Sequence, residues 1–164
     1  MKKIMIGLLI LTMSNITLLS QKQVTQEQDI LKDKELIKQV IQKAYVDGLC
    51  NNADVTAINR GFHPGFNLLG VGKGNIMWKY PIYSWVERAI DGKNKHKYSF
   101  QDEFTTIKFQ FVDVTGNAAV AKIDFYEGDK KKFVDYLSLL KFEDGWKIVT
   151  KTFYALPKKK NKKK

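Results

Sequence analysis

Hydrophobic positions along the chain follow two periods, a helical one first and an extended one later. From Asp29 onward the apolar residues recur at helical spacing and form one stripe, which Gly48 and the pair Asn51–Asn52 end. Asp54 is a suitable N-cap for a short second helix that ends at Gly61. The stripe of the first helix consists of Leu36, Ile37, Val40, Ile41, Ala44 and Tyr45.

A predicted hairpin follows and leads into a third helix. Residues 66–71 and 76–80 read as strands, and residues 72–75 between them contain two glycines, which is typical of a turn. Pro81 fits the first turn of a helix because its missing N–H has no partner to lose there. We expect this helix to end at Gly92.

The second half of the chain predicts four long strands joined by turns. Helices that come first and consecutive antiparallel hairpins that come last indicate an α+β fold, with the helices on one face of a bent antiparallel sheet. The expected strands cover residues 104–114, 118–126, 133–142 and 146–156, with Gly116-Asn117, Gly128-Asp129 and Asp144-Gly145 at the bends.

The ends of the chain differ from its body. Lys2 and Lys3 precede an apolar run over residues 4–13, and residues 14–20 are partly small and polar, which is the layout of a secretory signal peptide. The run is too short for a transmembrane helix. We therefore expect an exported protein, periplasmic or secreted, with these parts: signal peptide 1–20, flexible segment 21–28, one domain over 29–157, and a disordered lysine-rich tail over 158–164.

Net charge changes this picture little. The formal charge is +11, but eight lysines at the two ends leave only +3 on residues 4–157. The body is thus mildly basic, and no specific nucleic acid is expected as a partner. The tail could bind anionic surfaces without specificity. A single cysteine, Cys50, and two histidines exclude a disulfide framework and make a metal centre unexpected, and no cofactor signature is present.

The last two strands indicate which side of the sheet faces the helices. Pairing them across Asp144-Gly145 puts Leu140 near Ile148, Ser138 near Thr150 and Tyr136 near Thr152, and we take this as the inner face. The opposite face is also partly apolar, so we expect a second subunit to cover it in a homodimer. Its apolar residues are Leu137, Leu139, Val149 and Phe153.

Five segments of the chain resemble the putative lumazine-binding family of the nuclear transport factor 2-like superfamily. The resemblance implies a cystatin-like α+β cone in which three N-terminal helices pack into a curved sheet and leave a pocket, and subunits of such proteins commonly dimerise through the sheet. The matching segments are YVDGLCNNAD (45–54), FHPGFNLLGV (62–71), PIYSWVE (81–87), VTGNAAVAKIDF (114–125) and VDYLSLLKFEDGWKIVTKTF (134–153).

Such a pocket needs apolar walls and a few polar groups. Pro64 holds His63 in extended geometry, so its imidazole could point into the cone mouth as a ligand contact or general base, or it could bond the adjacent turn. Aromatic residues from the helical side and hydroxyls from the sheet complete the predicted site. We expect the ligand to contact Tyr45, His63, Trp78, Trp85, Tyr136 and Ser138.

Three functions remain open. Asp135 and Tyr136 are adjacent on one strand and face opposite ways, so no acid–base pair is evident. This favours a non-catalytic module that holds a small apolar or aromatic molecule in the cone. The alternatives are an isomerase- or cyclase-like enzyme that uses His63 or a buried aspartate, and a dimeric interaction module.

Overall fold

The computed structural model describes residues 26–94 and 104–157. It opens with one long helix: residues 26–40 are α-helical, and η1 (Ile41–Asn52) continues them with wider π-helical turns. Residues 26–28, which precede the predicted start at Asp29, are already helical, so the helix includes the end of the segment predicted to be flexible. The predicted signal peptide and the lysine-rich tail lie outside the described residues.

A short second helix, α2 (Val55–Gly61), follows as predicted. Its N-cap is Asp54, whose carboxylate accepts hydrogen bonds from the backbone N–H of Thr56 (2.9 Å) and Ala57 (3.1 Å). Gly61 lets α2 approach the long helix closely, because a Cβ at this position would lie 2.3 Å from the Cβ of Ala44. Asp54 thus caps the start of α2, and Gly61 allows its end to pack against the long helix.

Six strands form a single sheet in the order β2-β1-β6-β5-β4-β3. All neighbours are antiparallel except β1 and β6, which are parallel. The third helix, α3 (Ile82–Asn94), follows β2 rather than preceding the sheet, and it runs past the predicted end at Gly92. The strands are β1 (Phe62–Val71), β2 (Met77–Pro81), β3 (Thr105–Thr115), β4 (Ala118–Glu127), β5 (Lys130–Phe142) and β6 (Gly145–Ala155), with η2 (Lys73–Asn75) between β1 and β2.

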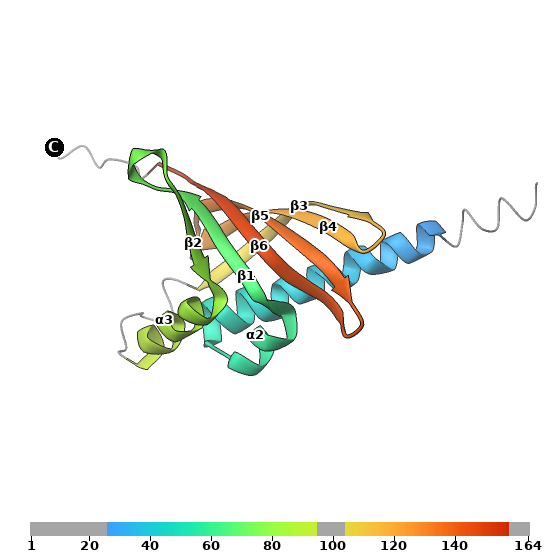
Figure 1. Ribbon diagram of the computed structural model, residues 1–164, viewed down its shortest axis with the longest axis horizontal. Coiled ribbons are helices and arrows are strands. Elements are labelled where there is room, and N and C mark those ends of the chain that lie inside the picture. The colour runs from blue at the N-terminus through green and yellow to red at the C-terminus, as the bar shows by residue number, and fades with distance from the viewer. Residues whose placement is uncertain (1–25, 95–103, 158–164) are drawn as a thin grey trace, which may run out of the picture.

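Figure 1 shows the sheet curving around the long helix, with α2 and α3 on the same side. The core lies between these two layers, where apolar side chains of both meet and are fully shielded from solvent. The predicted α+β cone is thus confirmed. Residues with no exposed surface in this core include Ile37 and Ile41 from the helix and Ile123, Leu137 and Ile148 from the sheet.

A β-bulge at Val149 decides which side chains of β6 face inward. Ser138 pairs with Thr150, but Leu139 pairs with Ile148, so Val149 is the extra residue on β6. Before the bulge the even-numbered residues of β6 point into the core, and after it the odd-numbered residues do. This change of alternation places Lys151 inside the cone.

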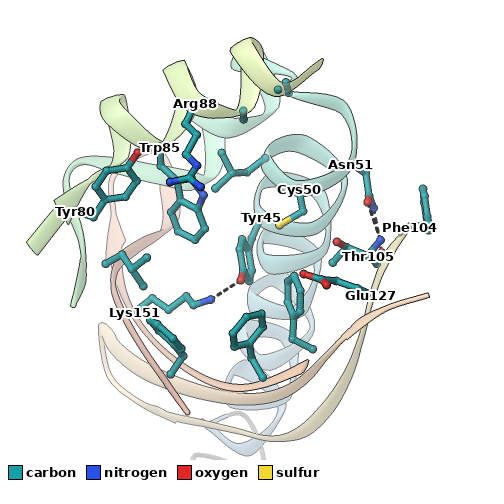
Figure 2. Close-up of a pocket in the computed structure, with 18 of the residues that line it drawn as sticks. Tyr45, Cys50, Asn51, Tyr80, Trp85, Arg88, Phe104, Thr105, Glu127 and Lys151 are labelled. Carbon is teal, nitrogen blue, oxygen red and sulfur yellow. Dashed lines mark hydrogen bonds between the residues drawn. The ribbon is translucent and has the colours of Figure 1, made fainter. Parts of the chain in front are cut away.

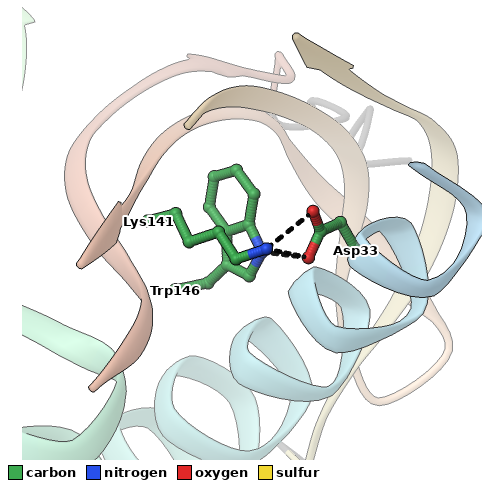
Figure 3. A network of polar contacts seen from close by, with 3 residues as sticks. All are labelled: Asp33, Lys141 and Trp146. Carbon is green, nitrogen blue, oxygen red and sulfur yellow. Dashed lines mark hydrogen bonds and ion pairs between the residues drawn. The ribbon is translucent and has the colours of Figure 1, made fainter. Parts of the chain in front are cut away.

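At the hairpin end of β5 and β6, a polar contact ties the sheet to the long helix (Figure 3). The Asp33 carboxylate accepts hydrogen bonds from Lys141 Nζ (2.8 and 2.9 Å) and from Trp146 Nε1 (3.0 Å). Trp146 is buried, so its indole N–H needs such an acceptor. The contact anchors the first described turns of the helix against the hairpin.

Candidate functional site

A cavity of about 660 Å³ opens between the long helix, α3 and the inner face of the sheet. This volume lies within the range of about 300–1,000 Å³ that is typical of small-molecule sites. Figure 2 shows its lining side chains converging from η1, α3 and the strands. The residues that line it are Tyr45, Leu49, Cys50, Asn51, Ala53, Leu68, Trp78, Tyr80, Trp85, Arg88, Ala89, Gly92, Phe104, Thr105, Phe125, Glu127, Phe133, Lys151 and Phe153.

Aromatic rings supply most of the wall. The Tyr45 ring lies 5.8 Å from both Trp85 and Phe125, measured between ring centroids. Phe133 bridges Phe125 and Phe153, at 5.6 Å from each. These separations are those of favourable offset and edge-to-face pairs, so the rings hold one another in place and present a rigid surface to a flat molecule.

Trp78 reaches the cavity because a glycine faces it. Gly70 on β1 pairs with Trp78 on β2, and a Cβ on Gly70 would lie 2.1 Å from the indole ring. The indole therefore lies flat over the backbone of β1. Its ring centroid is 6.2 Å from that of Phe153, which links the β1–β2 hairpin to the wall formed by β5 and β6.

A buried polar cluster lies at the inner end of this cavity. Lys151 Nζ is 2.6 Å from Asp135 Oδ2 and donates a hydrogen bond to the hydroxyl oxygen of Tyr45. Tyr45 in turn donates to Asp135 Oδ2 at 2.8 Å. The side chains of Lys151 and Asp135 are 6% and 0% exposed, so this is an ion pair withdrawn from water. Asp135 Oδ1 has no hydrogen-bond partner among the described residues.

Strand register brings these three groups together. Lys151 pairs with Leu137, and Asp135 pairs with Phe153, so the lysine and the aspartate are diagonal neighbours on the inner face of β5 and β6. Tyr45 comes from η1 on the opposite wall. Figure 2 shows the Lys151 side chain extending across the cavity toward the Tyr45 hydroxyl. The cluster thus joins the helix layer to the sheet layer.

Burial alters the acid–base behaviour of the cavity groups. It lowers the pKa of Lys151, although the neighbouring Asp135 opposes this effect. It raises the pKa of Tyr45 well above its usual value, and Asp135 adds to that shift. It also raises the pKa of the Cys50 thiol to about 12. The tyrosine and the cysteine therefore stay protonated at neutral pH and contribute no negative charge to the wall.

The outer part of the cavity is more polar. The Asn51 side chain exchanges two hydrogen bonds with the backbone of Thr105 (3.0 and 2.9 Å), which fixes the end of η1 to the start of β3. Arg88 from α3 and Glu127 from β4 also line the cavity. Glu127 forms an ion pair with Lys132 at 3.2 Å. Within the described residues, no group of three or more histidine, cysteine or acidic side chains could hold a metal ion.

Three of the six predicted site residues line the cavity, namely Tyr45, Trp78 and Trp85. His63 does not: its ring stacks on Phe142 at 4.9 Å and its Nδ1 accepts a hydrogen bond from the backbone N–H of Gly65. Of the two roles left open for His63, the structure therefore shows the hydrogen bond to the adjacent turn rather than a contact in the cavity.

The prediction that Tyr136 and Ser138 line the cavity is wrong. Tyr136 is 41% exposed, and it pairs with Lys122 and Thr152 on the outer face of the sheet. Ser138 shares that face. Two features cause this: the hairpin pairs Leu139, not the predicted Leu140, with Ile148, so the odd-numbered residues of β5 face inward, and the bulge at Val149 then turns Thr150 and Thr152 to the outer face.

The inward orientation of the odd-numbered residues of β5 also changes the predicted dimer surface. Leu137 and Leu139 are 0% and 1% exposed within the single chain, and Phe153 lines the cavity. Val149 is half-buried at the bulge. Because the chain itself covers Leu137 and Leu139 and Phe153 faces the cavity, these three side chains do not form an outer apolar face for a second subunit.

Sequence reasoning missed Lys151 as a cavity residue and Asp135 as its buried partner. Their charges were taken as part of a mixed outer face. The signal that could have found them is their position: Asp135 shares one strand face with Leu137 and Leu139, Lys151 shares one with Phe153, and an opposite-charge pair among such apolar neighbours is typical of a buried ion pair.

The curved sheet around a long helix, with a cavity between them, defines the nuclear transport factor 2-like class with a cystatin-like fold. The chain resembles an NTF2-like protein of unknown function from Shewanella baltica, with 25% identity and a TM-score of 0.62 over 78% of this chain and 97% of that one. An NTF2-like protein with a cystatin-like fold from Novosphingobium aromaticivorans gives a TM-score of 0.63 at 14% identity, covering 85% and 92%. One of unknown function from Silicibacter pomeroyi gives 0.58 at 16% identity, covering 81% and 98%.

Within this class the family is also established. A family model described as "Putative lumazine-binding" matches residues 32–154, and the chain belongs to that family, as its sequence segments predicted. No curated protein matches the chain. Among the described residues, no helix has the length and apolar character needed to cross a membrane.

Proposed function

We propose that this protein is an exported, non-catalytic module that binds a small, flat, largely apolar molecule in the cone cavity. One observation carries the binding proposal: the cavity has about 660 Å³ of space, walls of interlocked aromatic rings, and a buried lysine at its inner end. Membership of a family described by ligand binding supports it. Trp85 and Phe125 offer the flat surfaces on which such a ligand would stack.

Binding is favoured over catalysis because the carboxylates are poorly placed for acid–base work. Asp135 is fully buried behind Tyr45 and Lys151, and its Oδ2 already accepts from both. Glu127 is the one carboxylate among the described lining residues, and it is paired with Lys132. A general base must reach a substrate proton directly or through one water, and His63 lies elsewhere.

Tryptophan fluorescence provides the test of binding, because Trp78 and Trp85 line the cavity. Titration with a panel of flat aromatic and steroid-like compounds should change the emission of the full chain. Ala89→Trp should abolish the effect of any binder, since the added indole fills space that the ligand needs. Tyr136→Phe is the matched control, because it changes an aromatic residue on the outer face and should leave affinity unchanged.

Two results would contradict the proposal. One is that no compound in the panel binds; the other is that Ala89→Trp and Tyr136→Phe affect binding equally. Circular dichroism of both variants should match that of the parent chain. Because Ala89 is half-buried and faces the cavity, a larger side chain there has room to enter it.

The export part of the proposal rests on residues 1–20. Expression of the full chain in a bacterium, followed by N-terminal sequencing of periplasmic and secreted material, should find a shortened chain that begins near residue 21. Leu9→Arg interrupts the apolar run and should hold the protein in the cytoplasm. A cytoplasmic product of the unmodified sequence that begins at Met1 would contradict export.

A further inference from the structure

The ammonium group of Lys151 retains one hydrogen-bond donor that the described residues do not use. An ammonium group has three donors. Two of them serve the Tyr45 hydroxyl and Asp135 Oδ2. Lys151 itself lines the cavity, so the third donor can be reached by a molecule placed there.

Around that donor the protein offers rings rather than oxygen atoms. Lys151 Nζ lies 4.7 Å from the ring centroid of Tyr45 and 5.5–5.6 Å from those of Trp85, Phe125 and Phe153. Such faces attract a cation but are weaker partners for a donor than an oxygen lone pair is. A buried donor without an acceptor is costly, so a ligand oxygen at this point would be favoured.

The charge balance of the cavity indicates whether the ligand oxygen that accepts from Lys151 is neutral or anionic. Lys151 is already neutralised by Asp135 at 2.6 Å. The other charged residues among the described lining are Arg88 and Glu127, and Glu127 is already paired with Lys132. An anionic group next to Lys151 would therefore place a second negative charge beside a cation that Asp135 already neutralises, and a buried charge without its own partner is strongly unfavourable.

We propose that the cavity selects a neutral, flat molecule whose carbonyl oxygen accepts a hydrogen bond from Lys151. This inference rests on the proposed binding function and names the chemical class of the ligand. The rings of Trp85, Phe125 and Phe153 hold the flat body of the molecule, and the lysine determines which end enters first.

Three compounds built on the same tricyclic ring system provide the test. Fluorene lacks an acceptor, 9-fluorenone carries a neutral carbonyl, and fluorene-9-carboxylate carries an anion. Equilibrium dialysis against the full chain, with each compound quantified by chromatography, gives three affinities. Fluorenone should bind about tenfold more tightly than fluorene, the usual effect of one hydrogen bond from a charged donor, and more tightly than the carboxylate.

The informative variant is Lys151→Met combined with Asp135→Asn, because it removes both charges and leaves no lone buried ion. Fluorene should bind it as it binds the parent chain, and the advantage of fluorenone should disappear. Lys108→Met, on the exposed face of β3, is the control and should keep that advantage. A second readout is the carbonyl stretching frequency of bound fluorenone, which should shift downward only where Lys151 is present.

The outcomes separate the inference from the function on which it rests. If fluorene and fluorenone bind the parent chain equally well, the carbonyl contact is refuted while the cavity still binds flat molecules. If the carboxylate binds best and the double variant loses it, the ligand is anionic and the inference is wrong. If none of the three compounds binds, the proposed function fails as well.

Discussion

The buried pair Lys151–Asp135 predicts an unusual pattern of stability in a double-mutant cycle. The two charged atoms are 2.6 Å apart, and their side chains are 6% and 0% exposed. At an effective dielectric constant of about 20, their gross attraction is about 6 kcal/mol. Withdrawing each ion from water costs several kcal/mol, which offsets much of that attraction. The net contribution of the pair to the free energy of unfolding is therefore small. Each charge is nevertheless tolerated in the core only because the other one is present.

Lys151→Met should consequently be more damaging than removal of both charges. It leaves the Asp135 carboxylate buried with only Tyr45 as a donor, because Oδ1 has no partner among the described residues. We expect this variant to lose about 3–5 kcal/mol of unfolding free energy. Asp135→Asn should lose a similar amount, since it leaves the lysine without its counter-ion. The double variant should be more stable than either single variant by about 2 kcal/mol or more.

Urea unfolding of the full chain, followed by far-ultraviolet circular dichroism at pH 7, measures all four proteins. Lys108→Met is the control for the loss of an exposed lysine and should change stability by less than about 0.5 kcal/mol. The reasoning is refuted if the two single losses simply add in the double variant. Additivity would mean that the lysine and the aspartate act independently despite their contact.

Three further predictions concern residues at other points of the structure. The pKa of the Cys50 thiol is raised by burial to about 12, so iodoacetamide at pH 8 should modify the folded chain far more slowly than the urea-unfolded chain, as measured by mass spectrometry; equal rates would contradict it. Because the unfolded thiol ionises at a lower pH than the folded one, this group reduces stability as pH rises above about 9, and Cys50→Ala should lessen that decline. Gly61→Ala places a methyl group against Ala44 and should lower the unfolding free energy by about 1–3 kcal/mol, with partial recovery when Ala44→Gly is added; full stability of the single variant would show that the helices can move apart. Asp54→Ala removes the cap of α2 and should cost about 0.5–2 kcal/mol in thermal unfolding, whereas Asp54→Asn should cost less.

Local signals in the sequence were enough to predict most of the fold. The spacing of Ile37, Ile41 and Tyr45 predicted the long helix, and the cap at Asp54 predicted α2. Turn residues such as Gly116 and Asp144-Gly145 placed the hairpins, because these turns require residues that tolerate unusual backbone angles. The resemblance to a known family predicted the cone and its pocket.

The inner face of the sheet could not be predicted in the same way. A strict alternation of inward and outward residues holds only while a strand is regular, and one extra residue at Val149 inverts it. Nothing local marks that residue as a bulge, because valine is a common strand residue. Tyr45, Trp78 and Trp85 line the cavity as predicted, because they lie on elements that are not affected by this inversion.

The position of β6 has a consequence for how the protein is made. Strand β6, the last of the described strands, lies in the middle of the sheet, between β1 and β5, and it carries Lys151. A ribosome or an export channel releases the chain from its N-terminal end, so the β1–β2 hairpin and the β3–β5 strands emerge while they still have no common neighbour. These two groups of strands can become one sheet only when β6, which ends at Ala155, has left the ribosome or channel and pairs with both. The sheet is therefore expected to close only once β6 has emerged, and a chain that stops before β6 should retain two unconnected groups of strands with open edges, which is a state prone to aggregation.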